Sequence, residues 1–378
     1  MIPTPTTATT RTPRTEHLIN ELQSFGVRLA DPKAGVESRR GGAGPSDHKA
    51  ITIDDTTVMV PVHTAPAADS PYVAEAPDAA GRSRILRDGV ALASASFPKR
   101  PRFYDLRTAD GVPYWQVAQL HGRDVLATTV LQTCVRYQSR TKTCQFCAIG
   151  QSLAAGRTIA RKTPAQLAEV AKAAVELDGV THMVMTTGTP PGKDRGAAIL
   201  VESAVAIRAA VDLPIQAQCE PPDTDDWFPR MRDAGIDTLG MHLEAVTDPV
   251  RRRIMPGKAQ VPLSRYFDAF AAAVPVFGRG QVSTYILAGL GDAPADVLAV
   301  SERLIALGVY PFVVPFVPIS GTPLENHPAP GADVMDSILR PLSAMLRRSG
   351  LLASGIKAGC GKCGACSALS SYERRAAA

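Results

Sequence analysis

The chain has 378 residues, of which 45% are hydrophobic and 20% are charged. This length suits one barrel-sized domain or two ordinary ones, and the composition excludes disordered, collagen-like and coiled-coil proteins. The net charge of +5 is too small for this length to indicate a nucleic-acid partner, and we do not expect one.

The first 120 residues are predicted to form an α+β extension that is partly flexible. Residues 1–15 are rich in Thr and Pro, whereas residues 16–25 carry apolar side chains at helical spacing and predict a short helix. Residues 34–50 contain many glycines and predict a loop, in which Arg39 and Arg40 form a solvated surface. Short β-branched runs between residues 50 and 115 predict strands and hairpins.

Neither a secretion signal nor a membrane span is expected from the pattern of apolar residues. The first residues lack the apolar core of a signal peptide. The most apolar run, residues 309–319, is shorter than the roughly 18 residues that a span requires and contains three prolines. We therefore predict a soluble cytoplasmic protein, in which cysteines bind metals or act in catalysis more often than they form disulfides.

Residues 121–350 alternate between short apolar strands and helical segments. Strands are expected at residues 125–133, 182–188, 215–220, 238–246, 281–290 and 311–319, and helices at residues 164–177, 197–210, 262–273, 294–307 and 334–348. Thr163, Pro164 and Gln166 form a capping-box pattern, and Pro341 is expected to kink the last helix. The alternation predicts an α/β fold with a partial or full (βα) barrel, which fits better than a Rossmann sheet because no G-x-G-x-x-G segment opens the first helix.

The seven cysteines form two groups of three and one single residue, which is a poor disulfide framework. Cys134, Cys144 and Cys147 follow the first predicted strand, where a (βα) barrel holds its active site. Three thiolates ligate three irons of a [4Fe-4S] cluster and leave the fourth iron open to a substrate or cosubstrate. The alternative is a structural zinc site, for which His121 is the nearest upstream fourth ligand.

The Cys-Gln-Phe-Cys segment at residues 144–147 resembles the radical S-adenosylmethionine (SAM) superfamily, and within it the biotin-synthase-like branch. The family motif is C-x3-C-x2-C, but nine residues separate Cys134 from Cys144 here, and Arg140 stands where the first cysteine is usual. Cys134 is therefore the available first ligand. The resemblance implies a radical SAM barrel that holds a [4Fe-4S] cluster and SAM, with Phe146 beside them.

The ends of later strands resemble the same branch. Thr186, Thr187 and Gly188 look like the glycine-rich segment that holds the amino group of SAM, although its usual acidic end is absent. Glu244 is similar to the position that contacts the ribose or methionine of SAM. The three consecutive arginines at residues 251–253 lie where the branch supplies an arginine for the SAM carboxylate; the resemblance does not choose among them, and Arg253 is taken as the candidate.

Two further segments complete the resemblance, which covers roughly residues 125–330. Gly289 lies in a glycine-containing stretch like the one that binds adenine. Val317 lies in residues 316–324, which look like the F-x-P-x-x-G-T-P-L stretch of biotin synthase relatives. The resemblance thus implies that both residues contact SAM.

Polar residues alternate along the third and fourth predicted strands, so that each set shares one face of its strand. On the third predicted strand the set is Gln216, Gln218 and Glu220, and on the fourth it is Gly240, His242 and Glu244. Buried polar groups need partners, which a ligand in the barrel or the side chains themselves would supply. His242 is expected to be a satisfied core histidine. Cys219 falls on the opposite face, as a buried and inert thiol that points toward the helices.

Residues 351–378 are predicted to be a metal-binding tail. Cys360, Cys363 and Cys366 form a C-x2-C-x2-C pattern among glycines that resembles a ferredoxin cluster-binding run, which favours an auxiliary iron-sulfur cluster. A zinc knuckle with a ligand from elsewhere, or the completion of a partner's site, are alternatives.

The resemblance implies an enzyme that cleaves SAM reductively to a 5'-deoxyadenosyl radical, which abstracts hydrogen from a small molecule. A flavodoxin- or ferredoxin-type electron donor is implied with it. The chain is similar to a subgroup found alongside nitrilase-type enzymes, so a nitrile- or nitrogen-related metabolite is expected. One alternative is sulfur insertion of the biotin- or lipoyl-synthase kind with the auxiliary cluster, and another is a non-enzymatic iron-sulfur or zinc scaffold. No residue that acts on the substrate is predicted.

Overall fold

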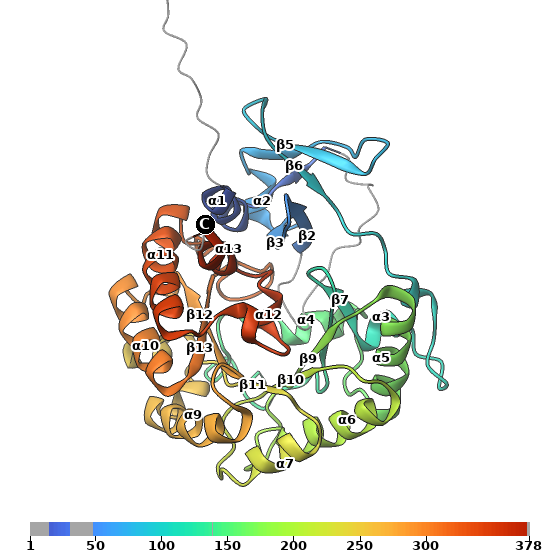
Figure 1. Cartoon of the computed structure of the whole chain (residues 1–378), viewed down its shortest axis with the longest axis vertical. Coiled ribbons are helices and arrows are strands. Elements are labelled where there is room, and N and C mark those ends of the chain that lie inside the picture. The colour runs from blue at the N-terminus through green and yellow to red at the C-terminus, as the bar shows by residue number, and fades with distance from the viewer. Residues whose placement is uncertain (1–14, 31–47, 138, 376–378) are drawn as a thin grey trace, which may run out of the picture.

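A computed structural model describes residues 15–30, 48–137 and 139–375 (Figure 1). The predicted flexible residues 1–14 and most of the predicted loop at 34–50, including Arg39 and Arg40, lie outside these ranges. The described chain contains a six-stranded sheet and a seven-stranded sheet. No described helix is long and apolar enough to cross a membrane.

The seven-stranded sheet is the predicted barrel, and it is open. Its parallel strands are β8 (Val125–Thr129), β9 (His182–Thr186), β10 (Ile215–Gln218), β11 (Thr238–Gly240), β12 (Val282–Ala288) and β13 (Val309–Pro315). Strand β7 (Gln119–His121) pairs antiparallel to β8 and ends the order β13-β12-β11-β10-β9-β8-β7. Each parallel strand overlaps one predicted strand, and the curled sheet is a partial barrel (Figure 1).

The helices cover the convex side of this sheet (Figure 1). The predicted helices are α5 (Pro164–Asp178), α6 (Ala197–Ala210), α9 (Leu263–Phe277), α10 (Pro294–Leu307) and α11 (Ala332–Ser349). The capping box is present, since Gln166 N–H donates to Thr163 Oγ1 over 3.2 Å and Thr163 N–H donates to Gln166 Oε1 over 2.9 Å. Helix α11 continues through Pro341. The short helices α4 (Ile149–Ala154), α7 (Trp227–Asp233) and α8 (Asp248–Ile254) span too few turns to give a clear apolar period.

The N-terminal extension has the expected α+β composition. Its sheet has the order β1-β4-β5-β6-β2-β3. The strands are β1 (Arg28–Leu29), β2 (His48–Ile53), β3 (Thr56–Pro61), β4 (Tyr72–Ala74), β5 (Arg82–Arg87) and β6 (Val90–Ser96), and the helical segments are α1 (Thr15–Phe25), α2 (Ala65–Ala68), η1 (Arg102–Asp105) and α3 (Tyr114–Val117). Helix α1 packs on β3 and α11, which joins the extension to the barrel.

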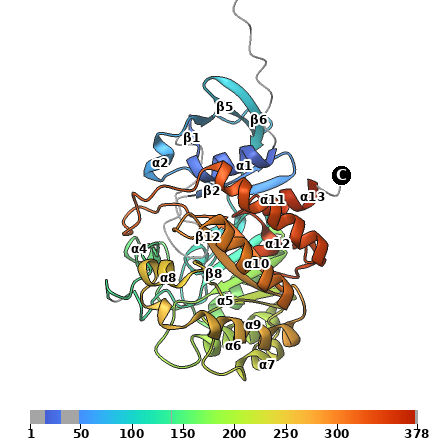
Figure 2. The same ribbon diagram turned by 90° about the vertical axis from the view of Figure 1, so that its left-hand side faces the viewer.

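The cysteine-rich tail lies in the interior of the molecule. After η3 (Ala353–Gly355) come α12 (Cys360–Cys363) and α13 (Leu369–Arg375). Figure 1 shows α12 inside the curve of the strands, and Figure 2 shows it between the N-terminal elements and the barrel. The Met59 N–H of β3 donates to the Ala365 carbonyl over 2.7 Å. The tail therefore closes the space between the two sheets.

Candidate functional site

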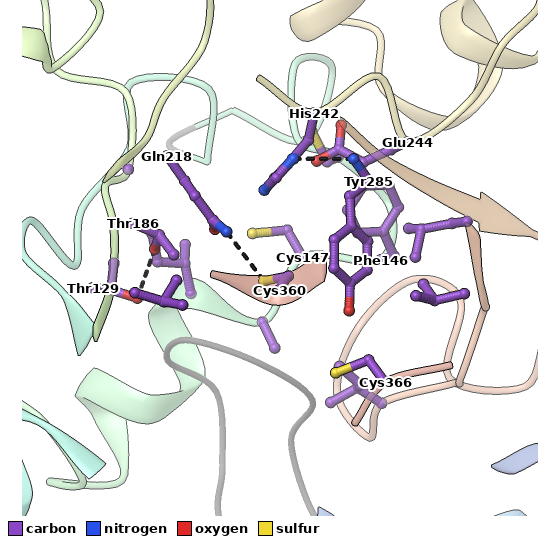
Figure 3. A pocket seen from close by; sticks show the side chains of 18 of the residues that line it. Thr129, Phe146, Cys147, Thr186, Gln218, His242, Glu244, Tyr285, Cys360 and Cys366 are labelled. Carbon is purple, nitrogen blue, oxygen red and sulfur yellow. Dashed lines mark hydrogen bonds between the residues drawn. The ribbon is translucent and has the colours of Figure 1, made fainter. Parts of the chain in front are cut away.

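Both cysteine groups line one cavity of about 410 Å³ inside the curl of the barrel strands. The predicted site residues on its wall are Cys134, Cys144, Phe146, Cys147, Thr186, Thr187, Gly188, Glu244, Val317, Cys360 and Cys366. Cys363, Arg253 and Gly289 are not among the lining residues. Gln23, His48 and Met59 of the N-terminal extension complete the wall. Figure 3 shows several of these side chains pointing into the common space.

The long loop after β8 returns to the cavity because its ends are tied to neighbouring loops. The Val135 N–H donates to the Thr189 carbonyl over 2.9 Å, and the Gln145 N–H donates to the Ile254 carbonyl over 2.8 Å. These bonds bring Cys134 and Cys147 to the same cavity despite the long first interval. Burial raises the pKa of the Cys147 thiol to about 12, so this thiol ionises only beside a cation such as iron.

Gly188 is required by the close approach of two strand ends. Its N–H donates to the Leu131 carbonyl over 2.9 Å, and a Cβ atom at this position would overlap the carbonyl oxygen of Thr133. Thr133 directly precedes Cys134. The glycine of the Thr-Thr-Gly segment therefore sets the path of the chain into the first cysteine.

We expect Gly188→Ala to lower the free energy of unfolding by about 1–3 kcal/mol, because the added methyl group must displace backbone. It should also lower the iron content per chain, since Cys134 moves with Thr133. Thermal unfolding and iron analysis measure both effects. Gly331→Ala is the control, because nothing lies within 4 Å of a Cβ atom there; equal effects in the two variants would contradict the explanation.

A buried ion pair joins the cysteine loop to β10. Arg136 donates from Nε to Glu220 Oε1 over 2.7 Å and from Nη2 to Oε2 over 2.6 Å, and Thr189 Oγ1 donates to the same carboxylate over 3.0 Å. Burial by itself would raise the pKa of Glu220, but the hydrogen bonds and positive charges of Arg136 and Lys258, with the Thr189 hydroxyl, together outweigh burial and lower it. Since Arg136 lies two residues after Cys134, the pair fixes the loop that carries this thiol.

A second buried pair joins Lys258 to Glu244 on the same wall of the cavity. Burial by itself would lower the pKa of Lys258, but the carboxylates of Glu244 and Glu220 together with other nearby acidic groups outweigh burial and raise it. Glu244 has a φ of 60°, which is a strained conformation for a residue with a side chain. Its N–H and carbonyl remain paired with Tyr285 and Leu287 over 2.8 Å each. The surrounding strands therefore hold Glu244 in this unusual conformation.

The predicted SAM contacts at Arg253 and Gly289 lie away from the cavity wall. Arg253 Nη2 donates to the Leu290 carbonyl over 2.8 Å, which fixes the glycine turn after β12. Arg251 is buried elsewhere and donates to the carbonyls of Leu243 and Val261. Lys258 therefore places a positive charge on the cavity wall, whereas none of the arginines at residues 251–253 does so.

Gln218 and His242 place polar groups on a cavity wall that is otherwise largely apolar. Gln218 Nε2 donates to Gln216 Oε1 over 2.7 Å, so the expected pairing of polar side chains is present in part. His242 Nδ1 accepts the Tyr285 N–H over 3.1 Å, and burial, together with Lys258, lowers the pKa of His242 to about 3. The imidazole is therefore neutral and carries its proton on Nε2. Figure 3 shows this edge of His242 facing the cavity.

The second cysteine group is held by side chains of β9 and β10. Cys360 N–H donates to Gln216 Oε1 over 3.0 Å, Gln218 Nε2 donates to Cys360 Sγ over 3.1 Å, and Gly359 N–H donates to His182 Nδ1 over 3.1 Å. All seven cysteines lie in the described residues, and none of them forms a disulfide there. Cys219 is buried as expected, but it lines the cavity, because regular strand pairing in β10 ends at Gln218.

Three residues of the site were not predicted. Arg136 lies in a loop and Lys258 begins the three-residue 3-10 helix η2 (Lys258–Gln260), and neither segment has a periodic pattern that indicates the direction of a side chain. Tyr285 lies on β12, and the alternation of Ser283, Tyr285 and Leu287 along this strand would have placed it toward the barrel interior.

Residues 140–304 match the family model described as the Radical SAM superfamily, and the match begins after Cys134. The chain is 28% identical over 211 residues to the bacteriochlorophyllide c C-7(1)-hydroxylase of Chlorobaculum limnaeum. This alignment covers 51% of the chain and 52% of the relative, so the chain spans about half the length of the curated relative that it matches.

Methylornithine synthase is a similar solved structure, with 17% identity and a TM-score of 0.46 over 65% of this chain and 67% of that one. The FeFe-hydrogenase maturase HydG from Carboxydothermus hydrogenoformans is 19% identical with a TM-score of 0.41, over 58% of this chain and 49% of that one. A radical SAM methyltransferase from Sphaerobacter thermophilus is 18% identical with a TM-score of 0.44, over 67% of this chain and 70% of that one.

Proposed function

Because the chain carries a radical SAM domain over residues 140–304, we propose that this enzyme abstracts hydrogen from a small molecule bound in its cavity. The observation that carries the proposal is that Cys134, Cys144 and Cys147 line one cavity together with the buried pair of Glu244 and Lys258. The family implies a [4Fe-4S] cluster and SAM. When bound, they supply reductive cleavage of SAM to methionine and a 5'-deoxyadenosyl radical.

The donor set fits this cofactor pair. Three thiols are available for three irons, which leaves the fourth iron open for SAM. In this proposal residues 121–350 form the barrel, residues 351–378 supply an auxiliary cluster site, and residues 1–120 are an extension whose Gln23, His48 and Met59 cover one side of the cavity. A flavodoxin- or ferredoxin-type protein supplies the electron.

Glu244 and Lys258 suit the zwitterionic end of SAM. An amino acid presents an ammonium group and a carboxylate next to each other, and these two side chains present the opposite charges on the cavity wall. We infer that Glu244 accepts the ammonium group and Lys258 donates to the carboxylate. The backbone of Thr186, Thr187 and Gly188 lines the same cavity and supplies further polar groups.

We expect Lys258→Met to weaken SAM binding about 30-fold or more, because truncating one member of a buried charge pair costs about 2–5 kcal/mol. Isothermal titration calorimetry on the anaerobically reconstituted protein measures the affinity. Arg253→Met is the matched control and should bind SAM like the wild type, since Arg253 lies off the cavity wall. If Arg253→Met weakened SAM binding and Lys258→Met did not, the SAM carboxylate would be bound by the arginines at residues 251–253 instead of by Lys258.

The remaining wall defines the substrate space. His242 presents a neutral N–H donor, and Tyr285 lies beside it with ring centroids 5.3 Å apart. Such groups orient a polar small molecule while the apolar wall excludes water. The relative from Chlorobaculum is named a hydroxylase, a reaction that also acts at a C–H bond. A nitrile- or nitrogen-related metabolite is the substrate class that the sequence resemblance favours.

The test of this function is the formation of 5'-deoxyadenosine. The protein is reconstituted anaerobically with iron and sulfide, reduced with dithionite and given SAM. We expect 5'-deoxyadenosine and methionine in equal amounts. A fully loaded protein that binds no SAM and forms neither product would contradict the proposal and support the scaffold alternative.

Sulfur insertion is the second candidate function, because Cys360 and Cys366 line the same cavity as the first cysteine group. It requires sulfide to leave the auxiliary cluster during turnover. Reconstitution with ³⁴S-sulfide and mass spectrometry of the product separates the two: hydrogen abstraction alone leaves the product free of ³⁴S.

A further inference from the structure

Two neutral side chains lie next to each other over Gly240 on the wall of the cavity. Gln218 ends strand β10, Gly240 ends the neighbouring strand β11, and His242 follows it by two residues. A Cβ atom at position 240 would lie 2.9 Å from His242 Cε1 and 3.0 Å from Gln218 Cγ. The glycine therefore leaves room for both side chains, and Figure 3 shows them pointing into the cavity.

The amide of Gln218 has a fixed orientation, because a backbone N–H fixes the orientation of its neighbour. The Cys360 N–H can only donate, so the atom that it contacts at 3.0 Å is the oxygen of the Gln216 amide. This oxygen accepts a second bond over 2.7 Å, which Gln218 Nε2 donates. Gln218 Nε2 also donates to Cys360 Sγ over 3.1 Å. Both protons of this amide are thus used, and Gln218 Oε1 has no donor among the described residues.

The ring of His242 is oriented in the same way. The Tyr285 N–H donates to His242 Nδ1 over 3.1 Å, so the neutral imidazole carries its proton on Nε2. Within the part of the chain that the structure describes, this second N–H has no acceptor. The wall therefore offers a ligand one acceptor, Gln218 Oε1, and one donor, His242 Nε2, from two neighbouring strands.

This combination selects a neutral ligand group. The charged side chains of the two buried ion pairs on the same wall already bind each other. A carboxylate ligand would place an oxygen against Gln218 Oε1, where both atoms only accept, and an ammonium ligand would place an N–H against that of His242. Each such mismatch leaves a buried polar group without a partner, which costs affinity. The group that fits donates through one atom and accepts through the next.

We propose that Gln218 and His242 recognise a primary amide or lactam group of the substrate. Its N–H donates to Gln218 Oε1, and its carbonyl accepts from His242 Nε2. This inference rests on the proposed function, because it names the class of small molecule that binds in the cavity with SAM. A nitrile offers an acceptor alone, so the pair favours an amide over a nitrile. The ring of Tyr285 lies beside His242 and covers the apolar part of such a molecule.

Four probes of similar size test the class of ligand: benzamide, benzoate, benzonitrile and benzyl alcohol. An aromatic ring fits well within a cavity of about 410 Å³. Each probe is titrated into the anaerobically reconstituted full-length protein, and ligand-observed NMR measures its dissociation constant. We expect benzamide to bind about 10-fold or more tightly than the others. Benzoate and benzonitrile leave Gln218 Oε1 without a donor, and benzyl alcohol has a single oxygen for both side chains.

Two substitutions of His242 separate recognition from folding. Asparagine has an oxygen near the position of histidine Nδ1, so His242→Asn should keep the Tyr285 N–H paired and lose the donor to the ligand. Glutamine has its amide nitrogen near the position of Nε2, so His242→Gln should keep that donor. We expect benzamide affinity to fall about 10-fold in His242→Asn and to stay within about threefold of wild type in His242→Gln. Gln218 is left unchanged because it also holds Cys360, and benzonitrile tests its acceptor from the ligand side.

The outcomes separate this inference from the proposed function. Equal binding of the four probes, no binding of benzamide, or equal losses in the two His242 variants would overturn the amide assignment. Benzyl alcohol that binds as tightly as benzamide would assign the pair to a hydroxyl group instead. A larger loss of SAM affinity than of benzamide affinity in His242→Asn would assign it to the adenine of SAM. Formation of 5'-deoxyadenosine by the wild-type protein tests the radical SAM function independently of all these results.

Discussion

Cys144→Ala should reduce 5'-deoxyadenosine formation below about 1% of the wild-type rate, because even the loss of an outer-sphere partner of a metal ligand costs 10–100-fold. Cys144 lines the cavity with Cys134 and Cys147, and two thiols leave the cluster with too few protein ligands. Iron content should fall by about four per chain, which is one cluster. Iron analysis, visible absorbance and product assays under anaerobic conditions measure the three effects.

Cys219→Ala is the matched control for this variant. Cys219 is also buried, lines the same cavity and has a thiol pKa raised to about 12 by burial. It lies in neither cysteine group, so its removal should leave iron content unchanged and SAM cleavage within about twofold of wild type, the range of a small packing change. A Cys144→Ala protein that keeps its iron and its activity would exclude Cys144 as a ligand.

Arg136→Met should lower the free energy of unfolding by about 3–5 kcal/mol, because it leaves the Glu220 carboxylate buried and unpaired. The same change releases the loop that carries Cys134, so cluster loading should fall as well. Denaturant unfolding of the metal-free protein measures the first effect, and iron analysis after reconstitution measures the second. Adding Glu220→Gln to Arg136→Met should recover part of the lost stability, since the buried charge is then removed.

Arg84→Met provides the comparison on the surface. Arg84 also holds a glutamate with two bonds, from Nε to Glu75 Oε2 over 2.5 Å and from Nη2 to Oε1 over 2.9 Å, but its side chain is 66% exposed. Water screens such a pair, so the change should cost at most about 1 kcal/mol. Equal losses for Arg84→Met and Arg136→Met would mean that burial of Glu220 is not the cause.

The secondary structure of the barrel follows from local patterns. The α6 and α10 boundaries coincide with the predicted ranges, and the capping box at Thr163 is present. Such features depend on residues within one or two turns of each other, so a single sequence contains the needed information. Helices α4, α7 and α8 are shorter than two full turns and are stabilised by their surroundings.

The predicted site residues lie on the cavity wall where they belong to a close-spaced motif or end a strand. Cys144, Cys147, Gly188 and Glu244 are of this kind, and all line the cavity. Arg253 follows a strand by several residues, and the turn of α8 points it toward Leu290 instead. The directions of loop side chains depend on contacts with distant segments, which a local pattern does not contain.

Local sequence was therefore sufficient for the strand–helix alternation and for the two groups of three cysteines. The folded chain was needed to bring Cys134 and Cys366 to one cavity and to set His121 against the tail. Both arrangements bring together residues that lie more than 200 positions apart in the sequence. They arise because the tail buries its apolar residues between the two sheets, and that packing depends on the whole chain.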